Sequence, residues 1–155
     1  MDPHLYSVNL TWSTERKGLM CSPELETSGT SSCIEVATPP QFPKGVPGIW
    51  SPEHLFTAAI SSCFMTTFLA IAEGSRLNFS SFACKASGKL EMIDGKLMMS
   101  EVTLSPEVVV MEAKDGERAL RVLQKTEAAC LITNSIKSKV IMNPEVTVKA
   151  NPILN

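Results

Sequence analysis

The longest hydrophobic pattern in the chain is the segment SPEHLFTAAISSCFMTTFLAIAE, which starts at Ser51 and is apolar or small almost all the way round. Ser51 is a favourable N-cap, and Pro52 suits the first helical position. Glu53 falls in the first turn, where the helix dipole favours an anion. We therefore predict a helix over residues 52–73, ended by Gly74. A helix that is apolar on every face is buried in its own domain or against another chain.

Patterns typical of β-strands lie on both sides of this helix. Before it we predict short strands at residues 6–12, 19–25 and 33–37, joined by polar turns at residues 13–18, where Gly18 can supply a positive φ, and 26–32. After it we predict two long strands, at residues 79–93 and 96–111, joined by a hairpin turn at Asp94-Gly95. A second amphipathic helix then starts at Asp115-Gly116, followed by a short helix at residues 133–137, a last strand at 140–149 and a tail at 151–155.

The order of these elements indicates the fold class. Strands and helices do not alternate, so we expect a single α+β domain over residues 1–155, with antiparallel sheets around the long central helix. One sheet cannot cover every face of that helix, so we expect a homodimer that buries the remaining face. Between the third strand and the helix, residues 38–50 contain four prolines, which excludes a helix or a central strand and predicts an ordered loop.

Composition and charge exclude several function classes. The 155 residues are 44% hydrophobic and 19% charged, which is typical of a globular protein. A net charge of −2 without basic runs argues against a nucleic-acid partner. No apolar run approaches the ~20 residues that cross a bilayer, so we expect no membrane partner. Residues 1–10 lack the pattern of a signal peptide, so we expect a cytoplasmic protein.

The cysteines carry the candidate chemistry. There are five, an odd number at wide spacing, and no Cys-x-x-Cys pair, which argues against a structural disulfide. With only two histidines in the chain, we expect no zinc or other metal site. Cys63 and Cys130 lie on or beside predicted helices, whereas the others lie in strands, where cysteine is usually an inert apolar residue.

Cys63 has hydroxyl-bearing neighbours, Ser61-Ser62 and Thr66-Thr67, in an otherwise apolar helix. Such hydroxyls can hydrogen-bond a thiolate. The alternative is that they bond the helix backbone and that Cys63 is an inert core residue.

Two segments resemble those of the OsmC/Ohr family, the osmotically induced and organic hydroperoxide resistance proteins. The Ser51 segment resembles the first cysteine helix of that family, and EAACLITNSIKSKV resembles its second cysteine segment. The hairpin at Asp94-Gly95 and the N-terminal Arg-x-Gly turn occur in the family's order. The resemblance covers nearly the whole chain and implies an intertwined homodimer with its active sites at the interface.

The resemblance also implies an activity, that of a cysteine-based peroxidase acting on organic hydroperoxides. It makes Cys63 the peroxidatic cysteine and Cys130 the resolving one, with Arg16 activating the thiolate and Glu53 holding the arginine. It implies no bound cofactor and an external dithiol reductant of the lipoyl type, such as a lipoylated protein. Four apolar residues would favour organic hydroperoxides as substrates: Phe42, Phe56, Phe64 and Met65. Taken singly, each of them is more typical of an ordinary hydrophobic core residue.

Two points conflict with this assignment. In a straight helix, Glu53 and Cys63 are ~15 Å apart, too far to share an arginine. Either the helix breaks near Ser61-Ser62, which we predict, or the acid and the sulfur come from different chains. In addition, Leu131 follows Cys130 where many family members have proline, which makes the geometry of the resolving step less assured.

Two other functions remain open. One is a non-catalytic dimeric module that binds a small hydrophobic ligand. The other is a cysteine hydrolase that pairs Cys63 with His54, although nine helical residues separate the two.

Overall fold

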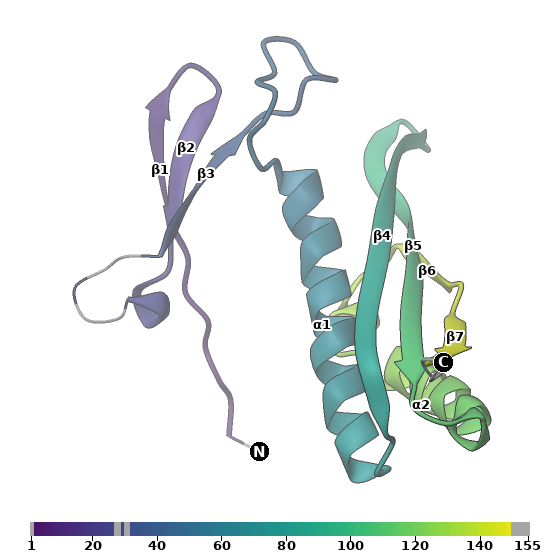
Figure 1. Cartoon of the computed structure of the whole chain (residues 1–155). Coiled ribbons are helices and arrows are strands. Elements are labelled where there is room, and N and C mark those ends of the chain that lie inside the picture. Colours follow the sequence, from purple (N-terminus) through teal and green to yellow (C-terminus); the bar gives the residue numbers. More distant parts are fainter. Residues whose placement is uncertain (1, 27–28, 30–31, 150–155) are drawn as a thin grey trace, which may run out of the picture. The chain divides into compact units, whose positions relative to one another are not determined.

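The computed structural model describes residues 2–26, 29 and 32–149 (Figure 1). The chain divides into two compact units, Met1–Leu55 and Phe56–Asn155, where the sequence predicts a single domain. The predicted tail at 151–155 and part of the predicted turn at 26–32 lie outside the described residues.

The first unit contains an antiparallel sheet in the order β1-β2-β3, formed by β1 (Asn9–Thr14), β2 (Lys17–Cys21) and β3 (Cys33–Ala37), with a short 3-10 helix, η1, at Pro23–Leu25. The turn between β1 and β2 takes its positive φ at Glu15, at 48°, and the expectation that Gly18 supplies it is wrong. Gly18 is needed for a different reason, because a Cβ there would lie 3.0 Å from the Thr11 carbonyl oxygen on β1.

A disulfide joins the last residue of β2 to the first residue of β3. Cys21 and Cys33 pair directly across the two strands, with 4.3 Å between their Cα atoms, and are bonded through their sulfur atoms. The prediction that this chain has no structural disulfide is therefore wrong. Count and spacing along the sequence do not show strand register, and it is the register that places these two residues opposite each other.

The loop after β3 is ordered, as its prolines predict. The Thr38 N–H donates to the Arg16 carbonyl at 3.1 Å, and the Val46 N–H donates to the Thr38 carbonyl at 2.9 Å. Inside the loop, the Phe42 N–H bonds to the Pro39 carbonyl at 3.0 Å. These bonds hold the loop to the β1–β2 turn.

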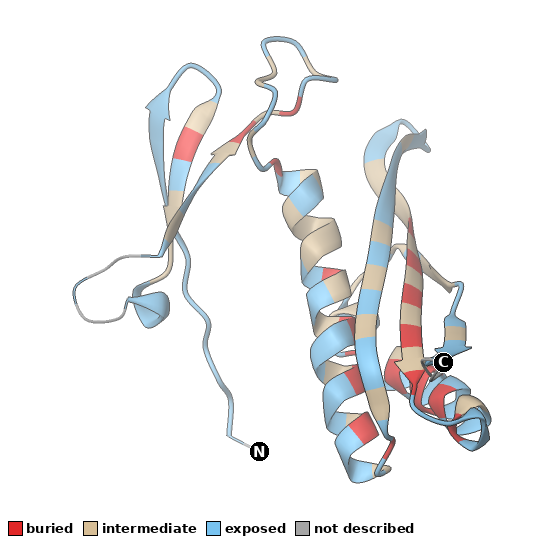
Figure 2. Ribbon diagram, viewed as in Figure 1, coloured by how far each residue is buried: buried red, intermediate tan, exposed pale blue. Residues whose placement is uncertain are grey.

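The predicted long helix is confirmed as α1 (Pro52–Gly74), but the predicted break is wrong, because α1 is one uninterrupted helix. Ser61 and Ser62 fit within it, since their hydroxyls each donate to a backbone carbonyl three residues earlier at 3.2 Å. One face of α1 is buried, at Ile60, Phe64, Phe68 and Ala72 (Figure 2). Beside this face, Met65 and Leu69 are 40% and 43% exposed.

By length and composition, α1 is apolar enough to cross a membrane, so the expectation that no segment approaches this length is wrong. This is weak evidence for a membrane protein, because the core helix of a soluble domain passes the same test. Here the buried face of α1 contributes to the core of the second unit.

The second unit is built on a long hairpin of β4 (Phe79–Ile93) and β5 (Lys96–Val110). Its turn is at Asp94 and Gly95, with φ of 49° and 76°, which confirms the predicted hairpin. The remaining elements are η2 (Ala113–Asp115), α2 (Gly116–Ala129), η3 (Thr133–Ser135), β6 (Lys139–Met142) and β7 (Glu145–Val148). The helix predicted at 133–137 is therefore a single 3-10 turn.

The predicted last strand is split in two at Asn143-Pro144. Both β6 and β7 pair with β5 in parallel, so this sheet is mixed and not wholly antiparallel. Proline lacks the N–H that a continuous strand would need at this point.

One face of this sheet carries the core. Alternate residues of β5 are buried together with the buried face of α1 and apolar residues of α2 (Figure 2). The β5 and α2 residues are Val102, Leu104, Val108, Val110, Ala119, Val122 and Leu123. Phe68 of α1 stacks on Phe82 of β4 with 4.6 Å between ring centroids. The α+β class is thus confirmed.

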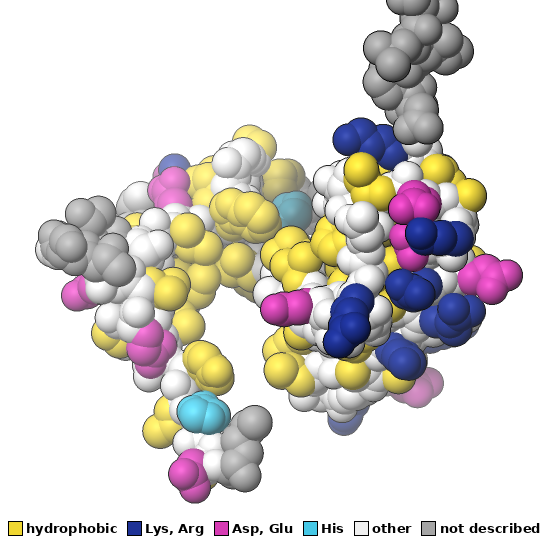
Figure 3. All heavy atoms as spheres, turned by 60° about the horizontal axis from the view of Figure 1, so that its bottom comes forward, with side chains coloured by type: hydrophobic (Ala, Val, Ile, Leu, Met, Phe, Trp, Pro, Cys, Tyr) yellow, Lys and Arg dark blue, Asp and Glu magenta, His cyan; other side chains and the backbone are white. Residues whose placement is uncertain are grey.

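Hydrophobic side chains also lie at the surface of the first unit (Figure 3). On β1 and β2, Leu10, Trp12 and Leu19 are 65%, 73% and 46% exposed.

Candidate functional site

Two of the predicted site residues, Cys63 and Cys130, meet within the second unit. Cys63 lies in the middle of α1 and is half-buried, whereas Cys130 is fully buried as the C-cap residue of α2. Both are free thiols, and the Cys130 thiol hydrogen-bonds to the Cys63 sulfur. The two side chains are therefore neighbours.

Backbone groups complete the surroundings of the Cys63 sulfur. After Cys130 the chain turns, and the N–H groups of Leu131 and Ile132 hydrogen-bond to Cys63. From α1 itself, the Thr67 hydroxyl oxygen lies 4.0 Å from the sulfur. Four donors thus converge on one sulfur atom.

The pKa values of the two thiols are shifted in opposite directions. Burial raises the pKa of Cys63, but the hydrogen bonds from the Ile132 N–H, the Cys130 thiol, the Thr67 hydroxyl and the Leu131 N–H outweigh it, and the net pKa is lowered. Burial raises the pKa of Cys130, and the neighbouring Cys63 raises it further. Of the two thiols, Cys63 is therefore the one that ionises at lower pH.

The other hydroxyls predicted beside Cys63 bond the helix backbone instead. Thr66 donates to the Cys63 carbonyl at 3.1 Å, and Ser61 and Ser62 bond earlier carbonyls. Only Thr67 fits the thiolate-binding interpretation. Sequence reasoning missed Leu131 and Ile132, because their contribution comes from backbone N–H groups that no side-chain pattern reveals.

Arg16 and Glu53 belong to the first unit. Arg16 is in the β1–β2 turn, and Glu53 lies in the first turn of α1 with its carboxylate oxygen Oε2 buried. Arg16 and Pro52 both line a cavity of about 480 Å³, so the guanidinium side chain lies near the start of α1. Because α1 is uninterrupted, Glu53 and Cys63 of one chain are separated by ~15 Å of helix rise.

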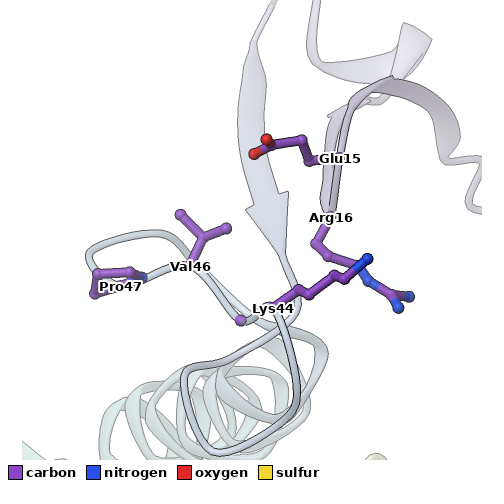
Figure 4. A pocket seen from close by; sticks show the side chains of 6 residues that line it. Glu15, Arg16, Lys44, Val46 and Pro47 are labelled. Carbon is purple, nitrogen blue, oxygen red and sulfur yellow. The ribbon is translucent and has the colours of Figure 1, made fainter.

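A second cavity, of about 610 Å³, is lined by Arg16 together with Glu15, Lys44 and the loop residues that follow Lys44. The side chains of Arg16 and Lys44 extend to the same side, whereas the Glu15 carboxylate points elsewhere (Figure 4). Lys44 has a positive φ of 62° in the loop that is tied to the Arg16 backbone.

The predicted apolar contacts divide into core and surface residues. Phe64 is fully buried and belongs to the hydrophobic core, so it is a core residue and not a substrate contact. Phe56 is partly buried and packs against that core. Met65 is 40% exposed, and Phe42 is half-buried in the loop of the first unit.

His54 does not lie with Cys63. Its Nδ1 is 2.8 Å from the Ser51 hydroxyl at the start of α1, and nine residues of unbroken helix, ~14 Å of rise, separate it from Cys63. A hydrolase that uses both residues of one chain is therefore not supported. In the described part of the chain, no three His, Cys, Asp or Glu side chains group closely enough to hold a metal ion.

Comparisons with known proteins identify the family of this chain. The sequence model of the OsmC-like protein family matches residues 45–145. A curated relative, the uncharacterized protein YmaD of Bacillus subtilis (strain 168), is 24% identical over 102 residues, which cover 64% of this chain and 68% of YmaD.

Solved structures share the fold. An OsmC-like protein of unknown function from Vibrio cholerae superposes with a TM-score of 0.80 at 24% identity, covering 92% of this chain and 99% of that one. The organic hydroperoxide resistance protein OsmC of Legionella pneumophila gives a TM-score of 0.71 at 18% identity, covering 96% and 100%. The organic hydroperoxide resistance protein OhrB of Bacillus subtilis gives 0.64 at 18% identity, covering 93% and 98%. The chain therefore belongs to the OsmC-like protein family.

Proposed function

We propose that this protein is a thiol-dependent peroxidase that reduces organic hydroperoxides to alcohols. The observation that carries the proposal is the paired arrangement of Cys63, whose pKa is lowered, and Cys130, whose thiol donates to it. The fold shared with organic hydroperoxide resistance proteins of Legionella pneumophila and Bacillus subtilis supports the same class of reaction.

The reaction proceeds in three balanced steps. The Cys63 thiolate attacks the terminal oxygen of the hydroperoxide, the O–O bond breaks, and the leaving alkoxide takes up a proton to give the alcohol. The Cys130 thiol then attacks the resulting Cys63 sulfenic acid, which gives a disulfide and water. An external dithiol restores both thiols by exchange and is itself oxidised to a disulfide.

The proposed roles of Arg16 and Glu53 involve a second chain. Because α1 is unbroken, we propose that the Arg16 and Glu53 that serve one Cys63 come from the partner in a homodimer. The exposed apolar side of α1, at Met65 and Leu69, supports such a dimer. Arg16 would stabilise the thiolate, and Glu53 would hold the guanidinium in a bidentate pair.

The remaining assignments follow from this reaction. We propose Phe42, Phe56 and Met65 as apolar contacts for the organic group of the hydroperoxide. The reductant is a dithiol of the lipoyl type, free or carried on a protein, and the location is the cytoplasm. No bound cofactor, nucleic acid or membrane enters the proposed cycle.

Thiol counting tests the proposal. Cys21 and Cys33 are first replaced by serine, so that only Cys63, Cys84 and Cys130 remain as thiols. One equivalent of cumene hydroperoxide should then consume two of these three thiols and yield one equivalent of the alcohol. Cys63→Ser should abolish alcohol formation, and Cys130→Ser should leave a sulfenic acid that a dimedone probe traps. Unchanged thiols in the parent protein would overturn the proposal.

A second candidate function is supported by the cavity of about 480 Å³ in the first unit, which is lined in part by Leu10, Trp12 and Val36. A non-catalytic module would bind a small hydrophobic ligand there. Binding of such a ligand, together with unchanged thiols after hydroperoxide treatment, favours this second function over the first.

A further inference from the structure

We propose that Arg16 and Lys44 form an anion-binding site in the first unit, which holds the carboxylate of a small organic acid. The two residues line one cavity of about 610 Å³, and their side chains extend to the same side (Figure 4). The inference deepens the proposed function and rests on it only for the identity of the ligand, a hydroperoxide or a dithiol that carries a carboxylate. The site itself lies wholly within the first unit.

The positive charges at this cavity are not balanced by nearby acids of the chain. Among the described residues that line it, the only acid is Glu15, and its carboxylate points in a different direction (Figure 4). No ion pair of the described residues includes Arg16 or Lys44, whereas the neighbouring Lys17 pairs with Glu35 at 3.7 Å. Two like charges at one cavity repel each other, and a bound anion offsets that repulsion.

The loop holds Lys44 in a backbone conformation that lysine rarely adopts. Its φ of 62° lies in the left-handed region, which is unfavourable for a residue with a Cβ. The next residue, Gly45, donates its N–H to the Phe42 carbonyl at 2.9 Å, and a Cβ on Gly45 would collide with the Pro39 carbonyl. Strained positions of this kind cluster at binding sites, so the presence of lysine here favours a role for its charge.

Hydrogen bonds join this loop to the turn that carries Arg16. The Thr38 N–H donates to the Arg16 carbonyl at 3.1 Å, and the Val46 N–H donates to the Thr38 carbonyl at 2.9 Å. Thr38 thus connects the backbone of Arg16 to the residue two places after Lys44. The folded backbone therefore fixes the points from which both cationic side chains project.

The groups around the cavity indicate an organic carboxylate as the ligand. The planar guanidinium of Arg16 can bind both oxygens of a carboxylate, and the Lys44 ammonium adds a second positive charge. Val46 and Pro47 also line the cavity and would contact the carbon atoms of the ligand. An inorganic anion would leave these apolar groups without a contact. Hexanoate is therefore a suitable probe, and hexanamide is its uncharged control.

Titration of the isotope-labelled protein with hexanoate at low salt, followed by NMR, tests the site. The amide signals of Gly45 and Val46 should shift saturably with hexanoate and stay unchanged with hexanamide. Lys44→Gln should weaken hexanoate binding about threefold or more, since one exposed charge is lost, whereas Lys44→Arg should retain binding. Lys17→Gln removes a cation that Glu35 already pairs with, so it should bind like the parent. Equal affinities of Lys44→Gln and the parent, or equal losses in Lys44→Gln and Lys17→Gln, overturn the site.

Lys44→Gly covers the case in which Lys44→Gln fails to fold, because glycine adopts a positive φ without strain. This variant should keep the melting temperature of a folded protein and bind hexanoate as weakly as Lys44→Gln. A folded Lys44→Gly protein that binds hexanoate as tightly as the parent overturns the site.

Steady-state kinetics identify which reactant carries the carboxylate. One comparison uses 6-hydroperoxyhexanoate and its methyl ester, and the other uses dihydrolipoate and dihydrolipoamide. For one of the two reactants, Lys44→Gln should raise the KM of the carboxylate form about threefold and leave the KM of the neutral form unchanged. Unchanged KM values in both comparisons would overturn the assignment to a reactant. Hexanoate binding by a protein whose thiols resist hydroperoxide would overturn the proposed function and leave the anion site standing.

Discussion

At the scale of single residues, the two paired cysteines differ in the groups that face their sulfur atoms. Cys63 is half-buried and has N–H, S–H and O–H donors, which lower its pKa, whereas Cys130 is fully buried, and burial and Cys63 raise its pKa despite the hydrogen bonds from Thr133. The sequence identified both cysteines and one of the hydroxyls, Thr67. It did not predict the two backbone donors, because every non-proline residue carries an N–H and only the folded turn aims one at a target.

The opposed pKa directions predict the order of alkylation. Only a thiolate reacts, so Cys63, with its lowered pKa, should react at lower pH than an ordinary thiol, and Cys130, with its raised pKa, only at higher pH. Limited iodoacetamide treatment at pH 7, followed by peptide mass spectrometry, should find label on Cys63 first. Label that appears first on Cys130 would contradict this assignment.

Thr67 and Thr66 provide a matched pair of variants. The Thr67 hydroxyl faces the Cys63 sulfur at 4.0 Å, whereas the Thr66 hydroxyl bonds a backbone carbonyl. Thr67→Val should move the pH profile of Cys63 alkylation to higher pH, with a loss of rate at pH 7 of about twofold. Thr66→Val should leave the profile unchanged, and a shift of the same size in both variants would contradict a specific role for Thr67.

At the scale of elements, local signals in the sequence gave reliable predictions and long-range pairing did not. The start of α1 at Pro52 and the hairpin at Asp94-Gly95 are encoded by a few adjacent residues, and both are confirmed. The split of the last strand into β6 and β7 and the Cys21–Cys33 disulfide depend on which strands become neighbours. The predicted break in α1 was wrong because Ser61 and Ser62 bond earlier carbonyls and fit within a continuous helix.

The disulfide should stabilise the folded protein by reducing the conformational entropy of the unfolded chain. The bridge spans a sequence separation of 12 residues, and closing a loop of that size contributes about 3 kcal/mol in the chain-entropy model. The double variant Cys21→Ser/Cys33→Ser should lower the free energy of unfolding by that amount, measured by urea denaturation with fluorescence of the exposed Trp12. Cys84→Ser, which removes a free thiol, is the control. Equal stability of the parent and the double variant would contradict this role.

At the scale of the whole molecule, the exposed apolar side of α1 and the separation of Glu53 from Cys63 lead to the same expectation, a homodimer. The α+β class and the family could be inferred from the sequence because the two cysteine segments and the hairpin occur in a specific order. Whether one chain or two would supply such a site could not be decided from a single sequence, since no local pattern records which copy supplies a residue.

Replacing one exposed leucine tests the dimer. Leu69 on α1 and Leu120 on α2 are 43% and 40% exposed, so they have similar exposed fractions but lie on different helices. The parent protein should sediment as a dimer, and Leu69→Lys should weaken that dimer at least tenfold because it places a charge in an apolar interface. Leu120→Lys should sediment like the parent. A parent protein that is monomeric at micromolar concentration would contradict the expectation.

Mixing two inactive variants tests whether the site is shared. Consider a mixed dimer in which one chain carries Glu53→Gln and the other carries Cys63→Ser. If each site combines Cys63 of one chain with Glu53 of the other, one of the two sites keeps both residues. If each site lies within one chain, neither site keeps both. After refolding from an equal mixture, about a quarter of the parent peroxidase activity should return if chains combine at random. Each variant refolded alone is the control, and no recovery in the mixture would show that each chain supplies its own acid.

The bridge between Cys21 and Cys33 affects how any redox measurement on this protein must be interpreted. It adds a second thiol–disulfide couple to the one proposed for Cys63 and Cys130, so a chain taken from fully oxidised to fully reduced would accept two electrons for each couple. A titration against a dithiol buffer should show two midpoints. Only the midpoint that disappears in Cys63→Ser reports on the proposed turnover. A reductant strong enough to reduce both couples would prepare Cys63 and Cys130 for catalysis and would also break the disulfide between β2 and β3.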